Sequence, residues 1–464
     1  MMRSLFSGVA GLKTHQTKMD VIGNNIANVN TVAYKSQNVT FQELMYQTTQ
    51  NASAANAETG RGGINAKQIG LGVQTGAINA NITTSGASQT TGNPFDIQIK
   101  GDSFFIVSDG ANNYFTRAGA FYVDGMGNLA MTSNGYTVMG WQEDPQKPGT
   151  IVKDTVSALK IMSAENMTSE PEQTTKAYLS GVIDKNSTQL TSTNGLIVNI
   201  GLYDELGYSY IAKFAIKDTG TSQTDGKFSF TAVDLIDSNG YSLMHSKSEA
   251  GYEKTGYDAD GGPGYSASIA CDKTQLTYDV KSGKSLDVDA AGNDLPFTLT
   301  VTGIPAFTAP IIMGVGASTM YDNKGTSTIK GNSGDYDGNY AGRKVGEMSG
   351  VAIAQDGKIT ATYDNGTSKL LGQIAVANFS NPSGLEKIGD NLYQSTPNSG
   401  AFDGIGEDIT AGSGAMSTGV LEMSNVDLSA EFTDMITTQR GFQANSRIIT
   451  VSDSMLEELT NLKR

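Results

Sequence analysis

The two ends of this 464-residue chain carry the feature that most limits its fold. Near the start, apolar side chains recur at separations built from threes and fours, which is the spacing of one helix face and close to a coiled-coil repeat. The spacing predicts a helix over residues 3–29, roughly 40 Å long. Such a helix is poorly stable alone in water, so it needs a partner. The residues of this first apolar stripe are Leu5, Val9, Leu12, Met19, Ile22 and Ile26.

A comparable stripe lies at the other end of the chain. Residues 427–464 contain no proline and one glycine, Gly441, and they predict a helix roughly 55 Å long. Two helices paired as a hairpin leave part of each stripe uncovered, and such surfaces mark association. Head-to-tail contacts of this kind build rings or open helical filaments. The residues of this second apolar stripe are Leu428, Phe432, Met435, Phe442, Ile449 and Leu456.

Four asparagines crowd the end of the first predicted helix: Asn24, Asn25, Asn28 and Asn30. Asparagine competes for backbone hydrogen bonds and tolerates left-handed conformations, so it favours helix ends and turns. Two interpretations stay open, and they are compatible with each other. The cluster is an ordinary helix terminus with its loop, a shaped joint to the next part of the chain, or both.

Between the helices the hydrophobic period changes to two, and short apolar runs alternate with Asp-Gly, Asn-Gly and Gly-Asn pairs. This pattern is typical of β-hairpins. The chain is therefore predicted to be mainly β and multidomain, with a β domain split by an inserted β region and the helices outside both. Residues 31–70 are polar, and the run 47–63 is typical of a linker or of disorder. Within the insert, strands are expected at 195–207, 210–218, 226–237 and 297–304.

Charge and hydropathy exclude several partners. The formal net charge is −15 and the pI is about 4.6, whereas nucleic-acid binding needs clustered Lys and Arg. Residues 1–35 lack the unbroken apolar core of a signal peptide. No apolar run approaches the ~20 residues of a membrane span, so neither nucleic-acid binding nor membrane insertion is expected.

Residues for chemistry are scarce. The two histidines, His15 and His245, stand in no metal-ligand motif, and the single cysteine, Cys271, cannot form an intrachain disulfide. The acidic runs 257–262 and 334–339 lack the ligand spacing of a calcium loop, so acidic β-turns are expected. The pattern indicates no catalytic, cofactor-binding or metal site.

Five stretches, in this order, form a recognisable set of signatures. They resemble the axial proteins of the bacterial flagellum, and among these the hook proteins most. The terminal signatures do not separate hook from distal rod, but the insert 151–340 favours the hook because rod proteins resembling this chain are shorter. The stretches are LFSGVAGLKTHQTKMDVIGNNIANVNTVAYK (5–35), FQELMYQ (41–47), IKGDSFFIVSDG with YFTRAGAFYVDGMGNLAMTSNGYTVMGW (99–141), LLGQIAVANFSNPSGLEKIGDNLYQSTPNSG (370–400) and GVLEMSNVDLSAEFTDMITTQRGFQANSRIITVSDSMLEELTNL (419–462).

This resemblance implies nested, discontinuous domains stacked along a rod. The terminal coiled coil would be 1–30 with 425–464 and a connecting arm 31–70; the β core domain would be 71–150 with 341–420, and the outer β insert 151–340, as one domain or two.

The resemblance also implies a structural subunit rather than an enzyme, without cofactors. It would polymerise into the flexible curved coupling that passes torque from motor rod to filament. The two apolar stripes would form the polymerisation interface and the asparagines the joint. The implied partners are further copies in a helical homopolymer, the distal rod protein, the hook cap, the hook–filament junction proteins and the flagellar type III export apparatus. Its location would be extracellular, in the flagellum, after export without a cleaved signal peptide.

Two alternatives remain. One is a distal rod or hook-associated protein of the same family, and the other is a secreted β-rich adhesin or enzyme whose helices serve only for oligomerisation. In addition, some hook proteins cross-link between subunits through Cys and Lys, so the resemblance makes Cys271 a candidate for an inter-subunit cross-link.

Overall fold

The computed structural model describes residues 2–54, 60, 62–144, 146–220, 222–245, 267–287 and 295–462. The chain forms two compact units. The first contains Met1–Asn166, Val351–Ala361 and Lys369–Arg464, and the second contains Met167–Gly350 and Thr362–Ser368. The acidic run 257–262 lies outside the described residues.

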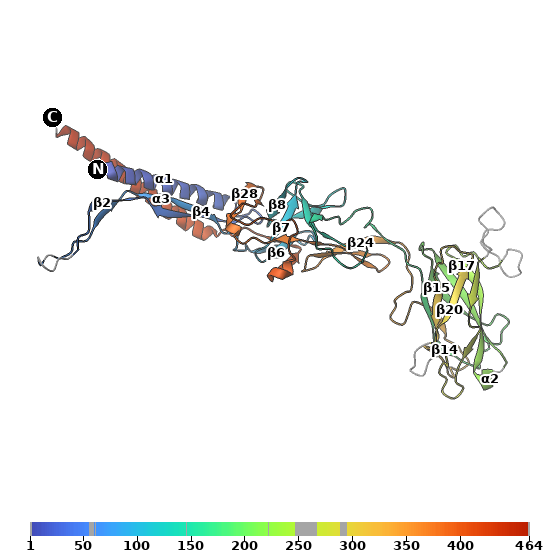
Figure 1. The fold of residues 1–464 in the computed structure, drawn as a ribbon. Coiled ribbons are helices and arrows are strands. Elements are labelled where there is room, and N and C mark those ends of the chain that lie inside the picture. Colours follow the sequence, from blue (N-terminus) through green and yellow to red (C-terminus); the bar gives the residue numbers. More distant parts are fainter. Residues whose placement is uncertain are drawn as a thin grey trace. The chain divides into compact units, whose positions relative to one another are not determined.

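Two long helices of the first unit, α1 (Met2–Ala27) and α3 (Leu428–Asn461), run side by side and antiparallel, as predicted (Figure 1). The chain enters α3 through a capped first turn, because the Asp427 carboxylate accepts hydrogen bonds from the backbone N–H groups of Ser429 and Ala430. Such a cap satisfies donors that the helix itself leaves unpaired. No described helix combines the length and the apolar character that crossing a bilayer requires.

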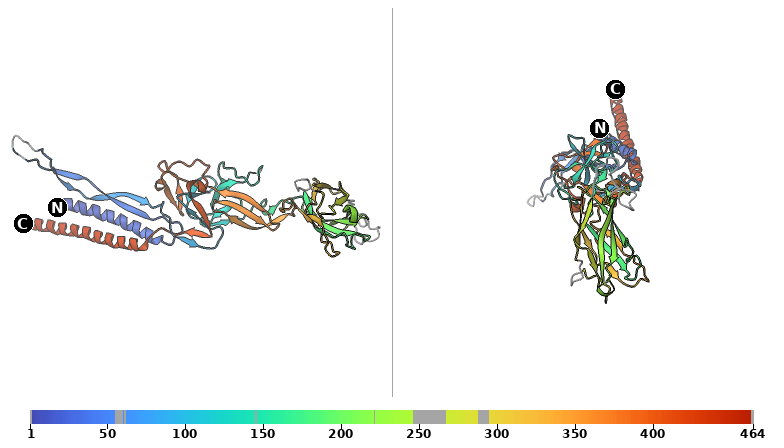
Figure 2. Two further views of the ribbon diagram at one scale, coloured as in Figure 1. Left: turned by 90° about the horizontal axis from the view of Figure 1, so that it is seen from below. Right: turned by 90° about the vertical axis from the view of Figure 1, so that its right-hand side faces the viewer.

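Residues after the first helix form an antiparallel ribbon of two strand pairs. Strand β1 (Gln37–Glu43) pairs with β4 (Val73–Ala80), and β2 (Tyr46–Gln50) pairs with β3 (Lys67–Gly70). The interpretation of 47–63 as linker or disorder is therefore wrong for its first residues, since the β2 side chains are exposed and look polar while their backbone is paired. The predicted boundary between residues 70 and 71 falls inside this ribbon, which Figure 2 shows from two further directions.

The main β structure of the first unit is one sheet in which the strands run in the order β25-β26-β11-β7-β8-β29-β28. Its core includes Phe104, Phe115 and Trp141, and the Trp141 indole donates to the carbonyls of Asp154 and Ile405 at 3.0 and 2.9 Å. The strands are β7 (Phe104–Ser108), β8 (Asn113–Thr116), β11 (Thr137–Gln142), β25 (Lys358–Tyr363), β26 (Ser368–Ile374), β28 (Glu386–Gly389) and β29 (Leu392–Gln394).

Shorter elements complete the first unit. Strands β9 (Phe121–Val123), β10 (Leu129–Met131), β12 (Ser157–Ala158) and β27 (Val376–Ala377) attach to this sheet. Two further pairs join distant segments: β5 (Ser88–Thr90) with β31 (Val420–Glu422), and β6 (Ile97–Lys100) with β30 (Ala415–Thr418). The 3₁₀ turns are Pro382–Gly384 and Ile409–Gly412. Strand β24 (Gly346–Ile353) continues the chain from the second unit into the first.

The second unit contains two sheets around one hydrophobic core, so its described part is a single domain rather than two. One sheet has the order β18-β20-β21-β14-β22 with β23 beside β14, and the other has the order β15-β16-β17-β19. The expected strands are confirmed as β15 (Leu196–Tyr203), β16 (Ser209–Asp218), β17 (Lys227–Asp237) and β20 (Phe297–Thr302). The remaining elements are β13 (Thr168–Ser169), β14 (Lys176–Ile183), α2 (Ser222–Asp225), β18 (Ser268–Cys271), β19 (Gln275–Thr277), β21 (Ile311–Gly314), β22 (Ser318–Met320) and β23 (Lys330–Ser333).

A five-residue turn with Asp first and Gly fourth recurs in both units. In each copy the Asp carboxylate accepts the backbone N–H groups two and four residues later, at 2.7 to 3.1 Å. The glycine has φ near +84°, which a residue with a side chain rarely adopts. The acidic run 334–339 is one of these turns, as expected. The turns begin at Asp124, Asp204, Asp237 and Asp335.

Candidate assembly interface

The two terminal helices meet along a seam of small and polar side chains. The seam residues recur every three or four positions on α1, and at steps of three, four, four and seven on α3, which is close to a coiled-coil repeat. The contacts, from the free ends of the helices inward, pair Ser4 with Ser452, Gly8 with Ile449, Gly11 with Asn445, His15 with Gly441, and Lys18 with Asp434.

Glycine at the seam permits a close helix–helix approach. A methyl group at Gly11 would lie 2.6 Å from the Asn445 amide nitrogen, and one at Gly441 would lie 2.7 Å from the His15 ring. Both distances are too short for real carbon contacts, so the Asn445 amide or the His15 ring would have to move out of the seam. The close approach at the seam thus depends on residues without side chains. A search for periodic apolar side chains cannot detect such contact positions.

The apolar stripes predicted from the sequence lie mostly off this seam. Only Ile449 enters a seam contact, through Gly8, and Ile22 is buried at 3% exposure. Val9 and Phe432 are more than half exposed, at 54% and 51%. Most stripe residues therefore do not form the seam of the pair, because the small residues one position away take that place, and their role in polymerisation stays a prediction. Of the other predicted residues, Leu428 and Phe442 are exposed, and Leu5, Leu12, Met19, Ile26, Met435 and Leu456 are half-buried.

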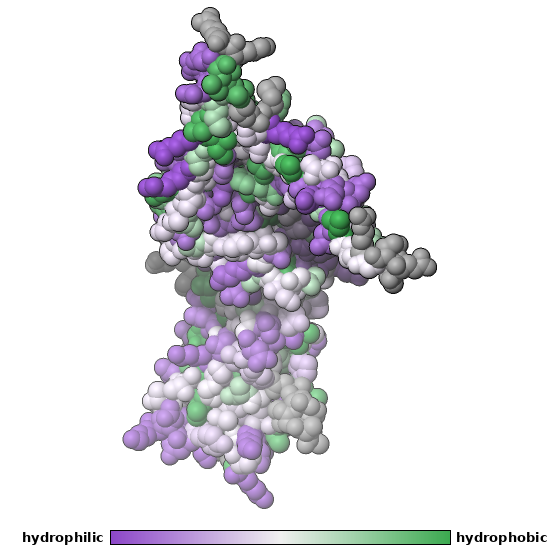
Figure 3. All heavy atoms as spheres, turned by 90° about the vertical axis from the view of Figure 1, so that its left-hand side faces the viewer, coloured by the Kyte–Doolittle hydropathy of each residue, from purple (hydrophilic) through white to green (hydrophobic). Residues whose placement is uncertain are grey.

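The exposed apolar surface is larger than predicted. On the end of the first unit that carries both chain termini, hydrophobic side chains gather in the space-filling view (Figure 3). They continue along α3 away from the seam. These additional exposed residues are Phe6, Ile436, Ile448, Val451, Met455 and Leu459.

Asn25 occupies the predicted joint and is buried at 1% exposure. Its amide nitrogen donates to the Glu431 carboxylate at 2.9 Å and to the Gln37 carbonyl at 2.8 Å, and its oxygen accepts the Gln37 backbone N–H at 2.9 Å. One side chain therefore joins α1, the start of β1 and the first turn of α3. The joint interpretation describes this residue better than a fraying helix end does.

The other asparagines have smaller roles in the structure. Asn24 donates to the Tyr34 hydroxyl at 3.2 Å, and Asn28 donates to the side chain and the carbonyl of Asn24, both at 2.9 Å. These bonds turn the chain out of α1. Asn30 is exposed.

A buried ionic network lies where the helices meet the β domain. The ammonium group of Lys35 is 2.8 Å from one Glu422 carboxylate oxygen, and the Arg117 guanidinium is 3.4 Å from the other. All three side chains are at most 1% exposed. The Gly86 backbone N–H also donates to Glu422 at 3.0 Å. Four segments far apart in sequence thus meet at one carboxylate.

The remaining donors of this network also have partners. Arg117 donates to the carbonyls of Gly101 and Ser103 at 2.6 to 2.9 Å, and Lys35 donates to the Thr84 carbonyl at 2.8 Å. Burial lowers the pKa of Lys35 despite the opposing effect of Glu422. Removing charges from water is costly, so the network persists only with these hydrogen bonds in place.

The sequence interpretation missed these three charged residues. Each lies inside a stretch that carried the family resemblance, yet none belongs to a motif with a chemical meaning of its own. A signal did exist: Lys35, Arg117 and Glu422 are isolated charges within apolar or small-residue segments. Sequence alone gave no reason to pair them, because 387 residues separate Lys35 from Glu422.

Cys271 lies in the second unit on β18, which pairs with β20. Its thiol is half-buried and donates to the Lys273 carbonyl at 2.8 Å. Burial raises the pKa of this thiol, so the reactive thiolate is disfavoured in the isolated chain. Within the described residues, no group of three or more His, Cys, Asp or Glu side chains is arranged to hold a metal ion.

Comparison with known proteins gives the same result at both ends and in the middle of the chain. The family described as flagella basal body rod protein matches residues 5–35, the flagellar hook protein FlgE/F/G D1 domain matches 98–169, and the flagellar basal body rod FlgEFG protein C-terminal family matches 417–462. The flagellar hook protein FlgE of Borreliella burgdorferi is 36% identical over 100% of both chains, and that of Treponema pallidum is 35% identical over 100% of both. The chain belongs to the flagellar hook protein family. As a hook-family chain it is a structural protein of the flagellum.

One comparison corrects an argument from length. The flagellar basal-body rod protein FlgG of Bacillus subtilis is 31% identical over 100% of this chain and 100% of its own. A relative named as a rod protein therefore spans residues 151–340 as well. The insert does not by itself separate hook from rod, and the two hook relatives of higher identity decide the assignment.

The buried network gives a stability prediction. Replacing Glu422 with Gln leaves two buried cations without their carboxylate, which typically costs about 3–5 kcal/mol. We expect the first unit of Glu422→Gln to unfold at a clearly lower urea concentration, measured by hydrogen exchange in its β7 and β8 amides. Glu386→Gln, at an exposed carboxylate on β28, is the matched control and should leave the midpoint unchanged. Equal midpoints for all three proteins would contradict the role of the network.

The seam gives a pH prediction through His15. Burial, and secondarily Lys18, lowers the pKa of this imidazole below 6.5, and its Nδ1 has no partner among the described residues. The unfolded chain therefore binds the proton more readily, and seam stability falls as pH drops below about 6.5. In the assembled protein, we expect α1 amide protection to fall between pH 7 and pH 5 beyond the intrinsic exchange effect.

His15→Gln should abolish that additional loss of protection, and His245→Gln, in the second unit, should retain it. A wild-type protection that follows only the intrinsic exchange rate over this range would show that His15 does not couple pH to the seam.

Proposed function

We propose that this chain polymerises into the tubular flagellar hook by burying the outer apolar faces of α1 and α3 against neighbouring copies. One observation supports this most strongly: the large apolar side chains of α3 point away from its seam with α1, and many are about half exposed. Contiguous exposed apolar surface on a soluble chain usually marks association. Burying one large apolar side chain contributes ~1.5–3 kcal/mol.

The seam composition supports the same proposal. Because the seam buries glycine, serine and threonine rather than large side chains, pairing of α1 with α3 gains little hydrophobic free energy. The helices then depend on burial in the polymer for most of their stability. Assembly and full helix formation are coupled in this proposal.

We further propose the domain roles expected from the sequence. The helix pair, 1–30 with 425–464, is the inner wall, and 31–70 is the connecting arm. The β sheet of the first unit and the second unit, Met167–Gly350 with Thr362–Ser368, slide against neighbouring copies as the tube bends. Polar contacts suit such movement better than apolar ones.

The proposed partners beyond other copies are the distal rod protein, the hook cap, the hook–filament junction proteins and the type III export apparatus. Export leaves the N-terminus uncleaved and places the chain outside the cell. We propose no catalytic activity and no cofactor.

A distal rod position is the second candidate, and the FlgG relative favours it. Electron microscopy of sheared appendages that carry an epitope in this chain separates the two. Label along curved tubes supports the hook, whereas label confined to the straight segment below them supports the rod.

The assembly proposal predicts a strong effect of the outer α3 face. Phe432→Ala with Ile436→Ala removes two exposed apolar side chains. We expect each contact between copies to lose ~3–6 kcal/mol of association free energy for the two side chains together. We expect no tubes by electron microscopy, while circular dichroism of the monomer keeps its β signal. Gln439→Ala with Gln443→Ala, at exposed polar positions of the same helix, should assemble normally. Tubes from the first variant would refute the proposed face.

The cross-link at Cys271 remains a proposal with its own test. In assembled hooks, the hydrogen bond to the Lys273 carbonyl would have to break. The Cβ–Sγ bond of Cys271 would then break as sulfur leaves as hydrogen sulfide, and the amine of a neighbouring lysine would add to the resulting dehydroalanine to form a C–N bond. Subunits from purified hooks should then migrate as covalent multimers in reducing, denaturing gels, and those of Cys271→Ser as monomers. Monomers alone from the wild-type protein, with an unmodified thiol mass, would exclude the cross-link.

A further inference from the structure

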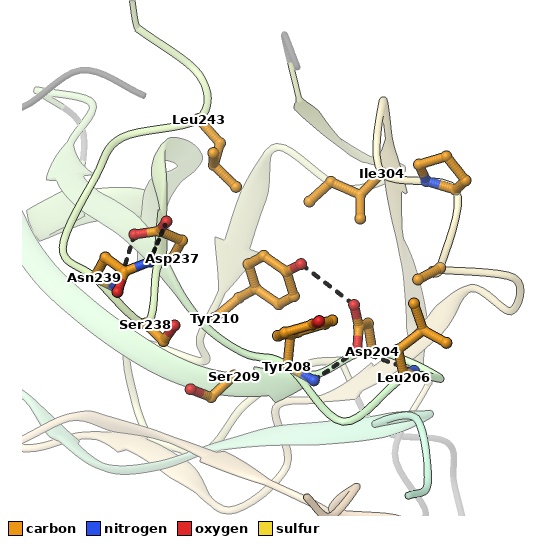
Figure 4. A pocket seen from close by; sticks show the side chains of 12 residues that line it. Asp204, Leu206, Tyr208, Ser209, Tyr210, Asp237, Ser238, Asn239, Leu243 and Ile304 are labelled. Atoms are coloured by element: carbon orange, nitrogen blue, oxygen red, sulfur yellow. Dashed lines mark hydrogen bonds between the residues drawn. The ribbon is translucent and has the colours of Figure 1, made fainter. Parts of the chain in front are cut away.

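A pocket of about 490 Å³ opens at one end of the second unit (Figure 4). Two of the recurrent Asp turns, which begin at Asp204 and Asp237, form its rim. The Tyr210 hydroxyl, which donates to Asp204 at 3.2 Å, lies between them. The apolar wall consists of Leu206, Tyr208, Leu243, Ile304, Pro305 and Ala306.

The pocket has the chemistry of a site for an amphipathic cation. Its lining holds the half-buried carboxylate of Asp237 and that of Asp204, which is 1% exposed and already accepts three hydrogen bonds, and it holds no Lys, Arg or His. Leu206 and Tyr208 are 62% and 61% exposed, so the apolar wall is uncovered in the isolated chain. A lysine side chain fits both properties, because its methylene stem packs on apolar surface while its ammonium group remains near charge.

The opposite end of the same unit carries complementary groups. Strand β17 runs from Lys227 to Asp237, and Asp237 lies at the pocket. Its other end, Lys227, pairs with Thr277, which lies just before the loop 279–284, so the loop is at the end of the unit away from the pocket. The loop presents the exposed lysines Lys281 and Lys284. Exposed apolar side chains accompany them, namely Val280, Leu286 and Tyr321. Asp279 caps the loop by accepting its own N–H groups, so the loop keeps one net positive charge.

We propose that the pocket receives the loop 279–284 of a second copy, with a lysine ammonium beside the half-buried carboxylate of Asp237. The proposal rests on the proposed polymer function and specifies one of its outer contacts. Because pocket and loop lie at opposite ends of one unit, the contact is head-to-tail and continues from copy to copy instead of closing a dimer. It thus suits an open helical assembly.

The geometry makes an unambiguous cross-linking test possible. The ten residues of β16 span most of the distance between the two ends, which is roughly 33 Å, so cysteines placed there cannot form a disulfide within one chain. In a Cys271→Ser background, we expect Leu206→Cys with Lys284→Cys to give a ladder of disulfide-linked oligomers when assembled tubes are mildly oxidised. Leu206→Cys with Thr231→Cys, whose second cysteine lies at an exposed position in the middle of β17, should give no ladder.

A second test changes the charge of the loop and needs no introduced cysteine. Lys281→Gln with Lys284→Gln should raise the subunit concentration needed for assembly several-fold, and Lys330→Gln, an exposed lysine on β23, should not. Tubes without a ladder from the first cysteine pair, or an unchanged assembly concentration, would overturn the pocket contact and leave the helix-based polymer intact. Failure of the wild-type chain to form tubes at all would instead count against the proposed function.

Discussion

The carboxylate of Glu422 holds the architecture of the first unit together. It lies just before the second terminal helix, and it binds Lys35, which follows the first helix, and Arg117 of the β domain. Since all three are buried, none of the charges can be satisfied by water. The entry and exit of the helix pair are thereby fixed to one point on the β domain. The side chain of Asn25 likewise connects separate segments, by hydrogen bonds to the Gln37 carbonyl and the Glu431 carboxylate.

The helix pair has two kinds of surface, a seam of small residues between the helices and an exposed apolar face on the outside. The seam between α1 and α3 uses glycines and small polar groups, so it sets distance and register but buries little apolar surface. The large apolar side chains remain on the outside, where the rest of the described chain leaves them exposed. The second unit, with its own core, is built on different strands and contributes separate surfaces.

Several features could be predicted from the sequence because they depend on local physics. The terminal helices follow from apolar spacing, and strands such as β15 and β16 follow from alternation and from turn residues such as Gly207. The apolar stripes were found, but their partners were misjudged. Hydrophobic periodicity reports which face must be buried and not what buries it, so the spacing could not show that Phe432 faces away from α1.

The sequence by itself determined the main element types and the membership of the flagellar hook family, because spacing, turn chemistry and signature stretches are encoded locally. Only the tertiary structure decided that Gly11 faces Asn445, that residues 37–43 and 73–80 form a ribbon, and that Lys35, Arg117 and Glu422 meet. The physical reason is that close approach and charge pairing depend on distances between segments hundreds of residues apart. Composition and periodicity contain no measure of those distances.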